Sequence, residues 1–132
     1  MPPTSFDELA VGHQFPSTSY QLTESVVSSY VGAVGGQQEF LTSGTVPPLA
    51  IAAFAMNALA KSFAVPPGSI HASQELEFLK TVAIGATVSC GGRIAQKIER
   101  GRLILVVLEI DAVNQAQEKV MAGKATIAIP QM

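Results

Sequence analysis

The sequence predicts an α+β fold in which a curled antiparallel β-sheet wraps around a long central α-helix. Three observations predict it: an apolar helical run over about 48–63, a change to two-residue alternation after it, and turn residues between the later strand-like runs. One strand, two helices and about four further strands fit helices packed on an antiparallel sheet. With 132 residues and no linker or repeat, the chain is expected to form a single domain, 1–132.

The first elements expected are a short strand within 13–23 and a helix from about Glu24 to Val34. Thr23 can cap this helix, and Glu24 suits its positive first turn. The apolar residues of the helix share one face and predict a buried stripe: Val27, Tyr30, Val31 and Val34. Gly35 and Gly36 then end the helix by permitting a left-handed backbone.

A second helix is expected from about Pro48 to Phe63, because Pro47–Pro48 suits a first helical turn and cannot continue a preceding helix. Its alanines leave a smooth surface that a sheet can approach: Ala50, Ala52, Ala53, Ala55, Ala58 and Ala60. A helix that is apolar on nearly all sides is expected at the centre of the fold. The apolar run is too short to cross a bilayer, which needs about 20 residues.

After Pro66–Pro67–Gly68 the hydrophobic period changes to two. Apolar residues (Ile70, Ala72, Leu76 and Phe78) alternate with polar ones (His71, Ser73, Glu75 and Glu77), which predicts a strand with one dry face. Three further strand-like runs follow, separated by turn residues at 99–101 and 114–117. We expect these four strands to form an antiparallel meander.

The amino-acid composition limits the kinds of binding partner that we expect for this chain. With 48% apolar and 14% charged residues, the chain has more apolar surface than a small monomer hides easily, which predicts a dimer or larger assembly. The net charge of −2 and eight scattered basic residues argue against nucleic acid or an anionic membrane as partner. Cys90 is alone, so neither an intrachain disulfide nor a cysteine zinc cluster is expected, and we expect no metal site. The start of the chain does not resemble a signal peptide, which predicts a cytoplasmic location.

Four segments resemble the MaoC-like dehydratases and (R)-specific enoyl-CoA hydratases. They are FDELAVGHQFPSTSYQLTESVVSSYVGAVGG (6–36), TVPPLAIAAFAM (45–56), SIHASQELEFLKTVAIGATV (69–88) and DAVNQAQEKVMAGKATIAI (111–129). The resemblance, which is to the N-terminal-type MaoC domain, implies the hot-dog fold. It also implies a role in fatty acid metabolism, namely hydration of enoyl thioesters or dehydration of 3-hydroxyacyl thioesters. The thioester, on coenzyme A or acyl carrier protein, would be the substrate, and no further cofactor is implied.

The sequence departs from this family where its chemistry should lie. Active (R)-specific hydratases follow the first helix with tyrosine, then Gly-Asp, then Asn-Pro and histidine, and the Asp and His activate water and handle the α-proton. Counting from Tyr30, Gly36 falls at the aspartate position, Gln38 at the asparagine and Leu41 at the histidine. Neither glycine nor leucine can transfer a proton. Because one positioned acid or base contributes about 10²- to 10⁴-fold in rate, little activity is expected from this chain alone.

Two other residues are candidates for catalysis. Glu39 is the one acid in the linker 35–45 and suits a base of the kind that hot-dog thioesterases place near the central helix, or an ordinary solvated glutamate. His71 matches a histidine often seen at this strand start in N-terminal-type domains. Its place on the polar side of the alternating strand fits an ordinary surface or interface histidine equally well. Cys90 is expected to pack in the core or at an edge.

A binding site is expected beside the start of the second helix. Backbone N–H groups there can polarise a thioester carbonyl; Pro48 has none, so the donors would be Leu49, Ala50, Gly35 or Gly36. The small side chains of Ala52, Ala53 and Ala55 leave room for an alkyl tail, although tight packing of the helix on a sheet explains them as well.

Three functions remain open at this point. The first is a MaoC-like subunit that binds acyl-CoA or acyl-ACP, has little activity alone and works as a homodimer or as a heterodimer with a second, catalytic hot-dog chain. The second is a self-sufficient enzyme, either an enoyl-CoA hydratase that uses Glu39 or His71 or an acyl-CoA thioesterase that uses Glu39. The third is a non-catalytic acyl-CoA sensor or carrier.

Overall fold

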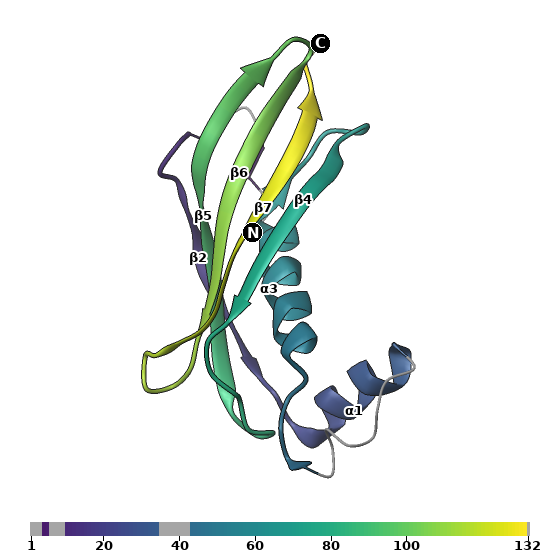
Figure 1. The fold of residues 1–132 in the computed structure, drawn as a ribbon, viewed down its shortest axis with the longest axis vertical. Coiled ribbons are helices and arrows are strands. Elements are labelled where there is room, and N and C mark those ends of the chain that lie inside the picture. Colours follow the sequence, from purple (N-terminus) through teal and green to yellow (C-terminus); the bar gives the residue numbers. More distant parts are fainter. Residues whose placement is uncertain (1–3, 6–9, 35–42, 132) are drawn as a thin grey trace.

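The computed structural model describes residues 4–5, 10–34 and 43–131, whose main feature is a five-stranded antiparallel sheet (Figure 1). Across the sheet the strands are β2 (Gln14–Gln21), β5 (Thr87–Arg100), β6 (Leu103–Val113), β7 (Lys119–Pro130) and β4 (Ile70–Phe78). A separate pair of two-residue strands, β1 (Thr4–Ser5) and β3 (Phe63–Ala64), is parallel. The predicted α+β class with a curled antiparallel sheet is confirmed.

The order of the strands corrects the predicted meander. Strands β5, β6 and β7 do follow one another as antiparallel neighbours, but β4 pairs with β7 at the edge of the sheet and not with β5. Strand β2, which precedes the helices in the chain, and strand β4, which follows them, therefore lie at opposite edges of the sheet. This arrangement lets the sheet extend to both sides of the helix that lies between β2 and β4 in the chain.

The predicted turns join the meander strands. Gly101 adopts a left-handed backbone (φ 60°) between β5 and β6. At the β6–β7 turn the Asn114 side-chain oxygen accepts hydrogen bonds from the backbone N–H groups of Ala116 and Glu118, at 2.9 and 3.0 Å. Gln117 closes this turn with φ 64°, a conformation that glycine adopts more readily.

Helix α1 (Glu24–Ala33) begins as the sequence predicts. The backbone N–H of Val26 donates to the Thr23 hydroxyl at 3.2 Å, so Thr23 is the N-cap. Val27 and Val31 are buried, and Tyr30, which is half-buried, packs against the core. Val34 is 58% exposed, so the predicted stripe is wrong at its last residue, which lies just beyond the end of the helix.

Helix α3 (Pro48–Ser62) lies against one face of the sheet (Figure 1). One side of the helix forms core with the strands: Ala50, Ile51, Ala52, Ala55, Ala58 and Leu59. The prediction of burial on nearly all sides is wrong for the single chain, because the sheet covers only this side. Among the described residues, neither helix has the length and hydropathy needed to span a membrane.

The sheet has two distinct faces. Alternate residues of β6 are buried on the face towards α3, here called the helix face: Val106, Leu108, Ile110 and Ala112. A methyl group on Gly92 would lie 3.1 Å from Leu59 Cδ2 of the helix and 3.4 Å from Ile110 Cγ2, so glycine at this position lets α3 approach β5. Glu109 and Asp111 point to the opposite side, here called the outer face.

Strand β4 does not have the predicted dry face. All of its residues are exposed except Leu76, which is half-buried, and Ile70 keeps 60% of its surface in contact with solvent. The alternation of the sequence is present, but β4 lies at the sheet edge, and no second layer formed by the described residues covers it. An edge strand with apolar residues and unpaired backbone groups is suited to pairing with another chain.

Candidate functional site: the open side of the central helix

A small apolar cavity of about 190 Å³ lies at the start of α3. Its walls are Thr45, Val46, Pro48 and Ile51 from the helix side, together with Phe78 at the end of β4 and residues 79–82 that follow it. The backbone N–H of Val46 donates to the Val82 carbonyl at 2.8 Å, which ties these two segments together. Ligand pockets usually occupy about 300–1,000 Å³, so this cavity needs a further wall to enclose an acyl chain.

The structure distinguishes between the backbone donors expected here. The N–H of Ala50 donates to the Pro47 carbonyl at 2.9 Å and its side chain is fully buried, so this N–H is already engaged within the chain. This finding counts against Ala50 as a donor to a thioester. Leu49 begins the open side of the helix with 60% of its surface exposed. Gly35 and Gly36 lie outside the described residues.

The open side of α3 carries a mostly apolar stripe, here called the α3 stripe: Leu49, Ala53, Met56, Asn57 and Ala60. Leu49, Ala53, Asn57 and Ala60 are exposed, and Met56 is half-buried. The expectation that Ala53 packs tightly on the sheet is therefore wrong, whereas Ala52 and Ala55 are buried as such packing requires.

One edge of the α3 stripe is polar. Asn57 Nδ2 lies 3.1 Å from the Tyr20 hydroxyl of β2, to which it donates a hydrogen bond. The Tyr20 ring packs on Phe54 of α3, with ring centroids 4.9 Å apart. These contacts hold α3 to β2 and leave an apolar surface between Asn57 and the other edge of the sheet.

His71 is not on the polar side of β4, and the sequence-based expectation is wrong for a specific reason. The register with β7 shifts between His71 and Ser73, so that His71 pairs with Ile127 and Ser73 with Thr126. Ile127 in turn pairs with the buried Val106 of the helix face. Directly paired residues share a face, so His71 belongs to the helix face, exposed at the edge of the sheet.

Glu39 and the two positions that replace the dyad, Gly36 and Leu41, lie outside the described residues. Within the described ranges, no group of three or more His, Cys, Asp or Glu side chains is close enough together to hold a metal ion. Cys90 is fully buried, which confirms the packing interpretation, and burial together with the nearby Asp111 raises the pKa of its thiol to about 11.

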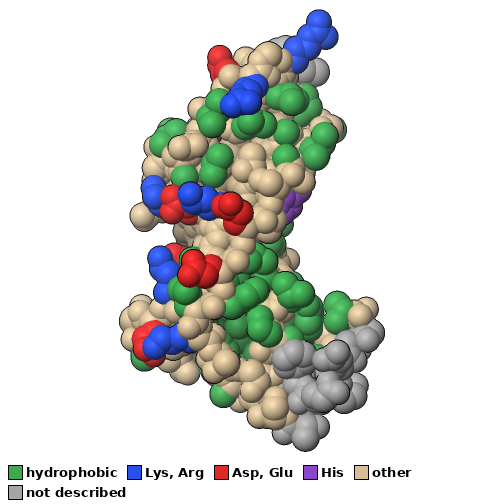
Figure 2. Space-filling view, in the orientation of Figure 1, with side chains coloured by type: hydrophobic (Ala, Val, Ile, Leu, Met, Phe, Trp, Pro, Cys, Tyr) green, Lys and Arg blue, Asp and Glu red, His purple; other side chains and the backbone are tan. Residues whose placement is uncertain are grey.

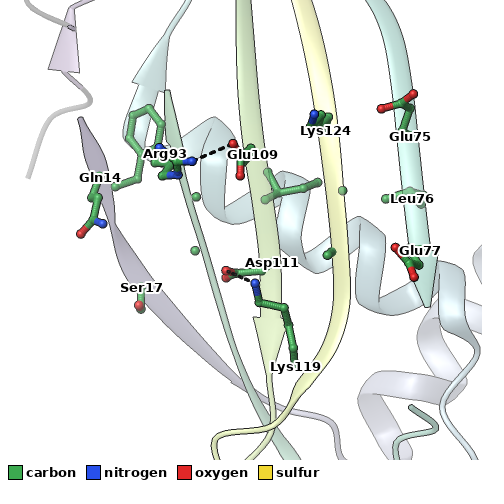
Figure 3. Close-up of a pocket in the computed structure, with 16 residues that line it drawn as sticks. Gln14, Ser17, Glu75, Leu76, Glu77, Arg93, Glu109, Asp111, Lys119 and Lys124 are labelled. Carbon is green, nitrogen blue, oxygen red and sulfur yellow. Dashed lines mark hydrogen bonds and ion pairs between the residues drawn. The ribbon is translucent and has the colours of Figure 1, made fainter. Parts of the chain in front are cut away.

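A second hollow, of about 790 Å³, lies on the outer face of the sheet (Figure 3). Charged side chains from four neighbouring strands surround it: Glu75, Glu77, Arg93, Glu109, Asp111, Lys119 and Lys124. The sequence did not predict this surface. The signal that was present is the charged residues at alternate positions of the strand-like runs, which only the register between strands brings together.

A curled antiparallel sheet with a helix against one face and the strands that flank that helix at its two edges defines a hot-dog domain. No protein-family model matches the sequence, and no curated protein matches it. Solved structures do match. R-hydratase PhaJ1 from Pseudomonas aeruginosa has 20% sequence identity and a TM-score of 0.77 over 96% of this chain and 85% of its own.

Two further structures support the same fold. The MaoC-like dehydratase from Rhodospirillum rubrum is 19% identical, with a TM-score of 0.75 over 96% of this chain and 97% of its own. A chain of the ChsH1–ChsH2 complex from Mycobacterium tuberculosis is 14% identical, with a TM-score of 0.73 over 91% and 98%. The chain therefore has the hot-dog fold of the MaoC-like dehydratases and (R)-hydratases, which confirms the fold that the sequence resemblance implied.

Proposed function

We propose that this chain is a MaoC-like subunit that binds an acyl thioester, on coenzyme A or acyl carrier protein, and depends on a second hot-dog chain for proton transfer. The single observation that carries the proposal is the open side of the central helix. The start of α3, through Pro48 and Ile51, and the end of the edge strand β4, through Phe78, both line a cavity that is too small for a ligand until another chain completes it. The α3 stripe begins next to Pro48 in the chain, at Leu49.

The residues of the linker 35–45 support a complex in which this chain binds the ligand and the second chain transfers the protons. Hydration of an enoyl thioester needs one group to deprotonate water and one to protonate the α-carbon. Gly36 and Leu41 occupy the positions of these groups in the sequence resemblance and can do neither. What this chain retains is the means to bind: apolar surface along α3 and the exposed start of the helix at Leu49.

The partner would add its own strand to β4 and cover the α3 stripe. Phe78 is 39% exposed on β4 and Leu49 is 60% exposed on α3, which is apolar surface suited to a protein interface. One of the similar structures is a complex of two differently named chains, ChsH1 and ChsH2, which supports a heteromeric arrangement. The same surfaces also suit a homodimer.

The test separates binding from turnover. Because the cavity needs a further wall, binding is measured at concentrations where light scattering shows that two copies of the chain have associated. There we expect the purified chain to bind a non-hydrolysable acyl-CoA analogue, measured by calorimetry, while hydrating crotonyl-CoA only marginally. Adding a hot-dog chain with an intact Asp and His should raise the rate above that of the partner alone. Brisk hydration by this chain alone, abolished by Glu39→Gln, would refute the proposal and assign the base to Glu39.

One observation favours a second candidate, a self-sufficient hydratase that uses His71. The shift in register gives His71 the same face of the sheet as α3, where an acyl thioester is expected to bind. If His71 is the base, His71→Ala lowers kcat by about 10²-fold or more with little change in KM. The hydrolysis of acyl-CoA, measured in parallel, tests the thioesterase alternative, and binding without turnover even in the presence of a partner would favour the sensor.

A further inference from the structure

The outer face of the sheet carries a row of alternating charge. Arg93 of β5, Glu109 of β6, Lys124 of β7 and Glu75 of β4 are direct cross-strand partners in that order. Their formal charges therefore alternate across four strands as plus, minus, plus, minus (Figure 3). Arg93 Nη2 lies 2.8 Å from Glu109 Oε1, and both side chains remain substantially exposed.

In the next row of paired residues, small side chains alternate with larger acidic ones. It consists of Gly91, Asp111, Ala122 and Glu77, again as direct partners across β5, β6, β7 and β4. The two small residues form part of the floor of the 790 Å³ hollow, and the two acids stand beside them. Lys119 Nζ lies 3.9 Å from Asp111 Oδ2, which partly balances the charge of that acid.

A third row, nearer the β5–β6 turn, is apolar. It consists of Ile98, Leu105, Ala128 and Ile70 in the same strand order. Ile98 and Ile70 are 36% and 60% exposed, while Ala128 is buried. Figure 2 shows hydrophobic side chains at this end of the molecule, with some Lys or Arg and Asp or Glu side chains among them, and a band of charged side chains below.

These rows share one symmetry. A two-fold axis parallel to the strands, between β6 and β7, brings β5 of one chain opposite β4 of its copy and β6 opposite β7. Arg93 then faces Glu75, and Glu109 faces Lys124, so every charge in the row meets its opposite. In the second row each acid faces a small residue, because Asp111 meets Ala122 and Glu77 meets Gly91. In the apolar row Leu105 meets Ala128.

We propose that the outer face is an isologous interface at which two copies of this chain pack their sheets back to back. A two-fold contact requires a self-complementary surface, and these three rows are complementary in charge, size and polarity under one axis. Stacked sheets lie about 10 Å apart, a gap that long side chains at the outer strands can bridge. If the charged row only stabilised the surface of a single chain, neighbouring residues of opposite charge would be enough. That role would not explain why small and large side chains also alternate in the next row.

The position of the axis restricts the larger assembly. A homodimer formed through β4 would have its axis at that edge, and two separate two-fold contacts whose axes do not meet build an open polymer. If a different hot-dog chain pairs with β4, the back-to-back contact instead gives a closed assembly that contains two copies of each chain. This step rests on the proposed function, but the back-to-back contact itself does not.

Cross-linking of the full chain tests the contact without any partner. Gln96 and Ser73 end a fourth row, with Val107 and Thr126 between them, and lie about 14 Å apart within one chain because three strand spacings separate them. In the proposed pair, Gln96 of one copy faces Ser73 of the other. A short bismaleimide should therefore join two chains of the double variant Gln96→Cys/Ser73→Cys. Each single variant should remain uncrosslinked, and the native Cys90 is buried.

Each outcome has a clear meaning. Covalent dimers from the double variant alone support the back-to-back contact. Dimers from Ser73→Cys alone, in equal yield, would overturn it, because near the middle of β4 that residue faces its own copy only when two β4 edges pair. No covalent dimer from any variant, at concentrations where light scattering shows association, would also overturn it.

A charge-swap experiment gives independent evidence. Arg93→Glu places an acid opposite Glu75 of the copy, and Glu75→Lys places a base opposite Arg93; each should raise the dissociation constant of the pair about tenfold. The double variant should recover most of this loss. Within one chain the two changes create like-charged neighbours beside Glu109 and Lys124, so only the intermolecular contact predicts recovery. Additive weakening in the double variant would refute the proposal.

Discussion

Gly92→Ala should destabilise the fold, because it adds a methyl group where α3 meets the sheet. That methyl would lie 2.7 Å from the Glu109 carbonyl oxygen, 3.1 Å from Leu59 Cδ2 and 3.4 Å from Ile110 Cγ2. The first of these is a backbone atom of the neighbouring strand, which cannot move aside as a side chain can. Overpacking of this kind costs about 1–3 kcal/mol, against a gain of about 0.4–1 kcal/mol from the less flexible unfolded chain.

The neighbouring Gly91 is a matched control for Gly92. It lies on the outer face, where a methyl group would be 3.5 Å from Ser17 Oγ and 3.8 Å from Asp111 Oδ1, both ordinary contacts. We expect urea unfolding, measured where both variants share one oligomeric state, to show Gly92→Ala losing about 1–2 kcal/mol relative to Gly91→Ala, with an unchanged m-value. Equal stability of the two variants would show that neither the β6 backbone at Glu109 nor α3 at Leu59 approaches Gly92 this closely.

Three further predictions concern single residues. Burial raises the pKa of the Cys90 thiol from 9.0 to about 11, so between these pH values the folded chain keeps a proton that the unfolded chain releases. The free energy of unfolding should therefore fall as pH rises from 9 to 11. Cys90→Ala should remove that fall. Gln117→Gly should stabilise the chain by about 0.5–1 kcal/mol in thermal unfolding, because Gln117 has φ 64°; an equal or lower melting temperature would mean that the turn holds no strain. Ala53→Leu, on the exposed α3 stripe, should change the unfolding free energy of the single chain by less than about 0.5 kcal/mol but weaken acyl-CoA binding; unchanged affinity would place the acyl site elsewhere.

Local signals in the sequence predicted local structure well. Helix α1 ends at Ala33 and helix α3 at Ser62, each one residue before the predicted end, and Thr23 caps α1 as expected. Capping, glycine turns and hydrophobic periodicity depend on neighbours in sequence, so one chain contains enough information to read them.

The errors arose where structure depends on distant residues. Nothing near β4 in sequence indicates that β7, about 50 residues later, is its neighbour, or that β4 forms an edge that no other layer within the described part of the chain covers. For the same reason Ile70 seemed part of a dry face although it is 60% exposed. The charged row of the outer face draws one residue from each of four strands, so no single segment reveals it.

The shift in register between His71 and Ser73 matters most for function, because it lets one strand contribute to two different surfaces. A regular strand would place His71 with Ser73, Glu75 and Glu77 on the outer face. The irregularity turns His71 alone towards the side of α3, where it can meet an acyl thioester or a partner chain, and leaves the acids in the alternating rows of the outer face. The two proposed contacts of this chain, one beside the central helix and one behind the sheet, can therefore be occupied at the same time.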